Sequence, residues 1–319
     1  MSVVIPQHMQ TPQTVQMIYD SYRARGGDGW RPHLGASLIG RECRRQLWYS
    51  FRWATKSTFK GRILRLFQTG DLEETRLTAD LQNIGVKVYH TNPETGAQWQ
   101  VKEDAKGFFG GSMDGLIIGL PEAPNTWHIV EYKTHGDRSY KDLVRKGVEL
   151  AKPEHYAQMQ IYMHLFKNPL HGGVKVNRAA YIAVNKNTDD IHFERIRYDR
   201  DFGEAIMLKA ANIIDSPVPP PREYDKEGFA CKWCDNKEQC WRNADLEANC
   251  RTCKHSAPGL WAPDFECKLL NEHRDVQDQK DMCGGDNSPI VPHAYSPIVS
   301  IDAIQVRKKR VKKKSVFEA

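Results

Sequence analysis

Two carboxylates and a lysine, Asp114, Glu131 and Lys133, have the types and the spacing of residues that could do chemistry together. Apolar residues 116–118 and 127–132 flank a segment of turn residues, and this pattern predicts a β-hairpin. Because side chains alternate between the two faces of a strand, Glu131 and Lys133 are expected to share a face. Their strand is apolar enough to be central, where buried charges must pair with each other or bind a cation.

The chemistry that these residue types favour is hydrolysis assisted by a divalent metal ion. Mg²⁺ and Mn²⁺ prefer carboxylate oxygens, which Asp114 and Glu131 would supply, and they retain water molecules that can react. A lysine beside them, Lys133, could orient the attacking water and stabilise developing negative charge. The alternative is a hairpin whose Glu131 and Lys133 form an ordinary salt bridge.

A third carboxylate comes from a helix predicted from about residue 67 to residue 84. Glu74 lies on the helical stripe that contains Leu77 and Leu81, which is the face expected to pack inward. Glu73 lies on the more polar side, so Glu74 is the better candidate for an acidic group near a metal ion. The alternative is that both glutamates are present because the helix dipole favours acidic residues in a first turn.

The eight cysteines separate into groups with metal-ligand spacing. The chain begins without a signal peptide, and CxxC pairs without a secretion signal favour metal binding over disulfides. Cys43 stands alone far upstream of the other seven. The downstream cysteines form a triplet and a quartet: Cys231, Cys234 and Cys240, then Cys250, Cys253, Cys267 and Cys283.

The remaining elements are expected to position these groups in an α/β fold. Ser37 is expected to cap a helix that continues toward Tyr49, and Pro153 to lie in the first turn of a helix. The order of helices and strands predicts a central mixed β-sheet flanked by helices. The predicted strands cover residues 86–89, 99–102, 179–184 and 191–198, and further helices cover residues 153–166 and 201–214.

Several motifs in the same order resemble the PD-(D/E)xK nuclease superfamily, over about residues 34–243. The closer resemblance is to its RecB/AddB-like subset with an iron–sulfur cluster, which includes the CRISPR-adaptation exonucleases. The motifs are Cys43, Gly70-x3-Glu74, Gly-x-x-Asp114-Gly, Glu131-x-Lys133, Gln158-x3-Tyr162 and the cysteine triplet 231, 234 and 240. Many of these relatives have a histidine where this chain has Glu74.

The resemblance implies a restriction-endonuclease-like core in which Glu74, Asp114 and Glu131 hold Mg²⁺ or Mn²⁺ and Lys133 serves the water. It also implies that Gln158 and Tyr162 contact DNA near the scissile bond. The cysteine triplet with Cys43 would hold a structural [4Fe–4S] cluster, although the same four thiolates could instead hold zinc.

The second cysteine group suggests a structural zinc site in a C-terminal, cysteine-rich appendage. Either His255 or His273 could replace one thiolate, and the alternative is a loop of free cysteines. The predicted ligands are Cys250, Cys253, Cys267 and Cys283. The chain is thus expected to divide into an extension (1–30), a nuclease core (31–245), a zinc knuckle (246–286) and a linker with a basic tail (287–319).

The charge distribution indicates a body without excess charge and a basic tail. The chain has 46 Lys and Arg residues against 40 Asp and Glu, and residues 306–319 hold seven Lys and Arg and one Glu, which accounts for the whole excess. Such a tail adds salt-dependent affinity for DNA; a nuclear localisation signal or a solvated tail without a partner are alternatives. No apolar run is long enough to span a bilayer, and the protein is expected in the cytoplasm of a bacterium or of a phage-infected host.

Taken together, the sequence predicts a metal-dependent DNA exonuclease of recombination, repair or phage DNA processing, acting on DNA ends or single strands. A protein partner such as a single-strand-binding or annealing protein fits this setting. One alternative is a non-catalytic nucleic-acid-binding protein with a zinc knuckle and a basic tail. The other alternative is an endonuclease of the same fold.

Overall fold

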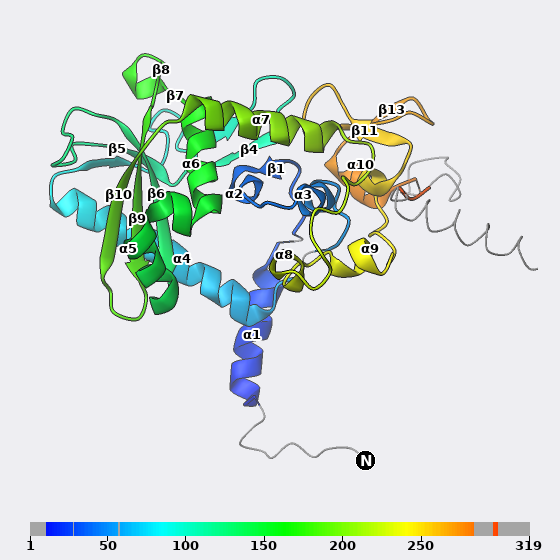
Figure 1. Cartoon of the computed structure of the whole chain (residues 1–319), viewed down its shortest axis with the longest axis horizontal. Coiled ribbons are helices and arrows are strands. Elements are labelled where there is room, and N and C mark those ends of the chain that lie inside the picture. The colour runs from blue at the N-terminus through cyan, green and yellow to red at the C-terminus, as the bar shows by residue number, and fades with distance from the viewer. Residues whose placement is uncertain (1–10, 28, 57, 284–295, 299–319) are drawn as a thin grey trace, which may run out of the picture.

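A mixed β-sheet forms the centre of the molecule, as the sequence predicts (Figure 1). The computed structural model describes residues 11–27, 29–56, 58–283 and 296–298. The strand order is β10-β9-β6-β5-β2, in which β6 and β9 run parallel and the other neighbours run antiparallel. The strands are β2 (Lys87–Tyr89), β5 (Gly115–Ile118), β6 (His128–His135), β9 (Arg178–Asn185) and β10 (Ile191–Arg197).

The predicted hairpin is confirmed, because β5 and β6 pair antiparallel with Gly115 opposite Val130. The predicted central position of the second hairpin strand is also confirmed, since β6 lies between β5 and β9. Val130 packs with Leu77 in one buried cluster, whereas Ile129 belongs to the other. The two faces of β6 therefore meet different helices.

Helix α4 packs on one face of this sheet and α6 on the other (Figure 1). The described residues form ten α-helices. They are α1 (Gln13–Arg25), α2 (Ala36–Ile39), α3 (Arg44–Phe51), α4 (Gly61–Asn83), α5 (Asp137–Ala151), α6 (Pro153–Leu165), α7 (Arg200–Asp215), α8 (Phe229–Lys232), α9 (Lys237–Trp241) and α10 (Val276–Asp281). Short 3₁₀ turns cover Pro169–His171 and Cys250–Thr252.

Three smaller sheets hold the remaining strands of the described residues. One has the order β1-β4-β3, one β11-β12-β13, and one joins β7 and β8. Their bounds are β1 (Leu34–Gly35), β3 (Gln100–Lys102), β4 (Phe109–Ser112), β7 (Lys167–Asn168), β8 (Val174–Lys175), β11 (Ser256–Pro258), β12 (Phe265–Cys267) and β13 (Glu272–Arg274).

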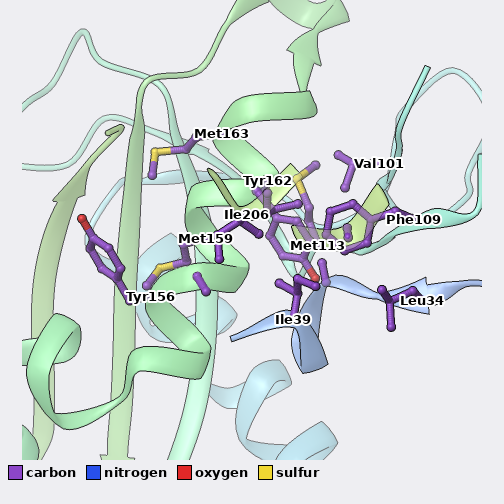
Figure 2. Packing of buried hydrophobic residues seen from close by; sticks show 14 of the residues in the cluster. Leu34, Ile39, Val101, Phe109, Met113, Tyr156, Met159, Tyr162, Met163 and Ile206 are labelled. Atoms are coloured by element: carbon purple, nitrogen blue, oxygen red, sulfur yellow. The ribbon is translucent and has the colours of Figure 1, made fainter. Parts of the chain in front are cut away.

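Helix α6 is the most deeply buried helix that touches the site, because Tyr156 to Met163 are all buried. Figure 2 shows its residues Met159, Tyr162 and Met163 among side chains from β1, α2, β4 and α7. Such a helix is apolar around most of its circumference, as expected for a helix packed between other elements.

Two helix starts differ from the sequence prediction. Gly35, not Ser37, is the N-cap of α2, because pairing of β1 with β4 holds Gly35 in an extended conformation. Helix α4 begins at Gly61 rather than near Phe67. A Cβ atom at Gly61 would lie 1.9 Å from the carbonyl oxygen of Tyr19, so α1 packs directly on the first turn of α4. Contacts with α1 thus support a first turn that local sequence does not mark.

Helix α5 was not among the predicted elements. Gly147 inside it adopts φ 75°, a left-handed conformation that interrupts the helical periodicity. The carboxylate of Glu194 accepts a hydrogen bond from the Val148 N–H at 2.9 Å, which satisfies a donor freed by the kink. The kink at Gly147 interrupts the helical pattern in the sequence, and the hydrogen bond from Val148 to Glu194 stabilises the chain there.

The C-terminal cysteine-rich segment packs on the core. Phe265 of β12 is fully buried in the main hydrophobic cluster, with its ring 5.9 Å from that of Phe51 and 5.7 Å from that of Phe108. Within the described ranges, no helix is long and apolar enough to cross a membrane. The basic tail from residue 306 lies outside the described residues, as do residues 1–10 and 284–295.

Candidate active site

Asp114, Glu131 and Lys133 meet at the centre of the sheet. Asp114 lies between β4 and β5, and its Oδ2 accepts a hydrogen bond from the Tyr132 N–H at 2.8 Å. Glu131 is 0% exposed, and its Oε1 pairs with the ammonium group of Lys133. Lys133 also donates to the carbonyl oxygen of Tyr132 at 3.1 Å. The antiparallel pairing of β5 and β6 thus brings together residues that are distant in the sequence.

Glu74 approaches this group from α4, whereas Glu73 does not. Burial, with the nearby charge of Asp114 second, raises the pKa of Glu74 to about 7, and Lys133 opposes the shift. Glu73 instead forms a salt bridge of 2.9 Å with Arg76 on the same helix. The structure therefore places Glu74, and not its neighbour, beside Asp114 and Lys133.

Burial and mutual repulsion make the ionised carboxylates unfavourable. Burial raises the pKa of Asp114, and burial together with the Asp114 charge raises the pKa of Glu131, while Lys133 lowers both. One ammonium group thus faces three carboxylates. The group lacks positive charge, which a bound divalent cation would supply.

The second carboxylate oxygen of Glu131 is the clearest sign that this group suits a metal ion. Oε2 is buried and has no hydrogen-bond partner among the described residues. Carboxylate oxygens are the ligands that Mg²⁺ and Mn²⁺ prefer, so the donor set fits. No group of three or more His, Cys, Asp or Glu side chains in the described chain is already arranged to hold a metal ion. Binding a cation would therefore require small side-chain rotations.

Gln158 and Tyr162 lie one turn apart on α6, beside the carboxylates, and both are buried. Gln158 Nε2 donates to the Tyr162 hydroxyl at 2.9 Å, and that hydroxyl donates to the carbonyl oxygen of Ser112 at 2.6 Å. Burial and then Glu131 raise the pKa of Tyr162, while Arg31 opposes them. These bonds brace the end of β4 two residues before Asp114; the predicted DNA contacts of Gln158 and Tyr162 stay a prediction.

A family model matches the chain over residues 36–241. This range contains Glu74, Asp114, Glu131, Lys133, Gln158 and Tyr162. The matched family is the PD-(D/E)XK nuclease superfamily. The chain belongs to this superfamily. The superfamily prediction from the motifs is confirmed, as is the mixed sheet flanked by helices. Nucleases of this superfamily generally use divalent metal ions such as Mg²⁺.

Solved structures add distant likenesses. LHK-Exo, an alkaline exonuclease from Laribacter hongkongensis, is 16% identical, with 61% of this chain and 90% of that chain covered and a TM-score of 0.41. Its complex with dAMP gives 15% identity, coverages of 62% and 89%, and a TM-score of 0.41. SSO0001 is 16% identical, with coverages of 72% and 97% and a TM-score of 0.41. A comparison with curated proteins finds no match.

The sequence did not predict a network of hydrogen-bonded side chains near Lys133 of this nuclease. The Tyr181 hydroxyl bridges His135 Nε2 and His155 Nδ1, at 2.8 Å each. Burial lowers the pKa of His135 to about 4 and that of His155 to about 3. Alternation along β6 could have flagged His135, which follows Glu131 and Lys133 on the same face; Tyr181 pairs with Glu131 in register.

The upstream cysteine and the triplet of the nuclease lie around one small cavity. Cys43 at the N-cap of α3, Cys231 in α8, Cys234 after it and Cys240 in α9 line one cavity of about 20 Å³. Burial is the main cause that raises the pKa of Cys43 and of Cys234, and the neighbouring thiols add to it. All four are free thiols.

The second group of the nuclease gathers separately. Cys250, Cys253, Cys267 and Cys283 are all buried free thiols. Burial, followed by the nearby Cys283, raises the pKa of Cys250 to about 12. The structure thus brings together the four members of each predicted set; which metal either set holds stays a prediction.

Proposed function

We propose that the protein is a metal-dependent DNA nuclease that hydrolyses phosphodiester bonds from a strand end. The observation that supports this most is the buried Glu131 carboxylate, with one oxygen on Lys133 and the other without a hydrogen-bond partner among the residues that the structure describes. A buried carboxylate oxygen without a hydrogen bond is energetically costly, and a bound cation would satisfy it. Its setting would be recombination, repair or phage DNA processing.

Each residue has a distinct part in the proposed reaction. Asp114, Glu131 and Glu74 would hold Mg²⁺ or Mn²⁺, which supplies Lewis-acid polarisation of the phosphate and a water of lowered pKa. Lys133 would orient the attacking water and stabilise the charge that develops on the phosphate. Its hydrogen bond to the Tyr132 carbonyl oxygen fixes the position of its ammonium group.

The test is cleavage of end-labelled linear DNA by the wild-type protein and by Asp114→Ala and Lys133→Ala, with DNA binding measured in parallel. Loss of cleavage with binding retained is expected. Equal loss of both in the two variants would favour a non-catalytic nucleic-acid-binding protein. Resistance of covalently closed circular DNA is expected of an exonuclease, and its cleavage would indicate an endonuclease of the same fold.

We further propose that Cys43, Cys231, Cys234 and Cys240 hold a [4Fe–4S] cluster and that the other four cysteines hold zinc. The support is the convergence of each set of thiols from its own part of the chain. Anaerobic purification followed by iron, sulfide and zinc analysis tests both assignments. About four irons and one zinc per chain are expected for this pair of sites, whereas a colourless, folded protein with two zincs would refute the cluster.

A further inference from the structure

A cavity of about 550 Å³ opens beside the candidate active site, and none of the chemistry above uses it. It lies between residues 27–41, the end of α3 with the segment after it, and the first half of α4. Its volume is in the range of about 300–1,000 Å³ that small-molecule ligands occupy, which is enough for one or two nucleotides.

Exposed aromatic rings line this cavity. Phe59 and Phe67 are each 48% exposed, and their rings meet edge to face at 5.2 Å. Trp30 packs its ring on that of Trp53, with centroids 4.7 Å apart. Large aromatic side chains that remain half exposed inside a concave site offer apolar faces to a ligand.

The charges of the lining are mostly positive. Arg31, Arg41 and Lys56 contribute three cations, against the single carboxylate of Asp235. Glu154 lies 3.7 Å from Arg41 at the edge and neutralises part of that charge. A lining that combines aromatic faces with cations suits a ligand that combines flat rings with phosphates.

Helices α4 and α2 each carry residues that line the cavity and residues that lie near the carboxylates. Phe67 and Glu74 are seven residues apart on α4, which is two turns along one face and about 10 Å. From the other side, Ala36 precedes the lining residues of α2, and a Cβ atom at Gly111 would lie 3.3 Å from its Cβ and 3.1 Å from the Tyr162 hydroxyl. A short polymer could therefore occupy the cavity and the carboxylate group together.

We propose that this cavity binds the unpaired bases of the DNA strand whose phosphodiester bond lies at Asp114 and Glu131. This inference rests on the proposed function and adds to it the substrate class. Bases within a duplex already stack on each other, whereas unpaired bases offer both faces to Phe59 and Phe67. The enzyme would then select ends with several unpaired nucleotides over blunt duplex ends.

Fluorescence of 2-aminopurine tests the stacking directly. A short single-stranded oligonucleotide that carries this base is titrated with the Asp114→Asn variant, which binds without turnover. Quenching on binding is expected, and Phe67→Ala and Phe59→Ala should each weaken binding by about fivefold to a hundredfold. Phe67→Tyr, which keeps the ring, should retain the quenching. Leu72→Ala is the matched control, because Leu72 is 65% exposed on another face of α4.

Three outcomes would overturn the inference. These are equal effects of Phe67→Ala and Leu72→Ala, equal binding of a blunt duplex, and absence of quenching, which would leave the cavity to another occupant such as a peptide. Failure of the proposed function gives a different result: quenching that depends on Phe67, together with no cleavage of any DNA by the wild-type protein.

Discussion

Arg251 and Glu131 are two of the buried charges of this nuclease, and the residues around them satisfy them in opposite ways. Arg251 of the C-terminal segment is 0% exposed, as is Glu131 of the central strand. Burial lowers the pKa of Arg251 and raises that of Glu131, so each region disfavours the ionised form. The two charges differ in the hydrogen-bond partners that the surrounding residues supply.

The guanidinium of Arg251 is surrounded by acceptors and rings. It donates to Gln279 Oε1 at 2.7 Å and to the carbonyl oxygens of Phe51 at 3.1 Å and Pro32 at 2.9 Å. Its Cζ lies 3.8 Å from the ring centroid of Trp53. These bonds tie the C-terminal segment to residues far upstream, which gives this charge a structural role.

Glu131, in contrast, keeps a buried oxygen that has no hydrogen-bond partner in the described part of the chain, and has Asp114 as a repelling neighbour. A protein interior tolerates such an arrangement where a ligand completes it. The comparison teaches that burial alone does not mark a functional charge in this molecule. Glu131 differs from Arg251 in having a buried carboxylate oxygen that no described residue satisfies.

The largest expected effect is that of Glu131→Gln on cleavage. The neutral side chain fits the same space, but cleavage of linear DNA should fall by about 100-fold or more. The free energy of unfolding of the metal-free protein should increase in the same variant. Because the folded pKa of Glu131 is raised, its ionisation destabilises the metal-free fold as pH rises above the unfolded value. Urea unfolding at pH 9 should show a gain of about 1–3 kcal/mol, and a loss would contradict the comparison.

Arg251→Met should have the second-largest effect, and with the opposite sign. It keeps apolar contact with Trp53 but leaves the carbonyl oxygens of Phe51 and Pro32 without this donor, which should reduce the free energy of unfolding by about 2–4 kcal/mol. The matched control is Arg242→Ala, whose exposed side chain pairs with Glu238 at 3.0 Å and should change stability by less than about 1 kcal/mol. Similar values for the two variants would mean that the buried bonds contribute little.

His155 of the imidazole network is a buried ionisable group whose effect on the free energy of unfolding depends on pH. The pKa of His155 is about 3 in the fold against 6.5 ordinarily, so the unfolded chain binds the proton more readily. The free energy of unfolding that depends on the neutral imidazole of His155 is fully present above pH 6.5. It is lost as pH falls toward 3, because the unfolded chain takes up the proton first. Denaturant unfolding at pH 7 and pH 4 should show a smaller acid loss in His155→Gln, by about 1–3 kcal/mol. The exposed His171→Gln should keep the full loss.

The smallest effect should separate the two adjacent glutamates of α4. Glu74→Ala is expected to lower the cleavage rate by about tenfold or more, because it removes a carboxylate from the proposed metal site. Glu73→Ala breaks only a surface salt bridge with Arg76 and should change the rate by less than about threefold. Single-turnover rates at saturating Mg²⁺ measure both. Equal cleavage rates of the two variants would mean that Glu74 does not take part in the proposed metal site.

Local sequence patterns were sufficient for the parts of this molecule that local physics determines. The apolar runs and turn residues around Asp114 and Glu131 predicted the hairpin, and helical spacing distinguished Glu74 from Glu73. The start of α4 at Gly61 and the kink at Gly147 could not be predicted in this way. Both depend on contacts with elements that are distant in the sequence.

The same limit explains what was missed around the site. The sequence around Arg251 contains nothing that marks it as buried, since its partners Pro32 and Phe51 lie some two hundred residues upstream. The cavity beside α4 is likewise formed by separate segments, and neither Trp30 nor Phe67 signals it alone. The grouping of Asp114, Glu131 and Lys133 was predictable because one hairpin and the residue before it carry all three.

The central claim, that the unsatisfied carboxylates form a metal site, is tested most directly by thermal unfolding with and without Mn²⁺ at pH 8. A ligand that binds only the folded state raises the melting temperature, and the rise increases with the ratio of ligand concentration to its dissociation constant. Mn²⁺ should raise the melting temperature of the wild-type protein and leave that of Asp114→Asn unchanged. An equal rise in both proteins, or none in the wild type, would contradict the account.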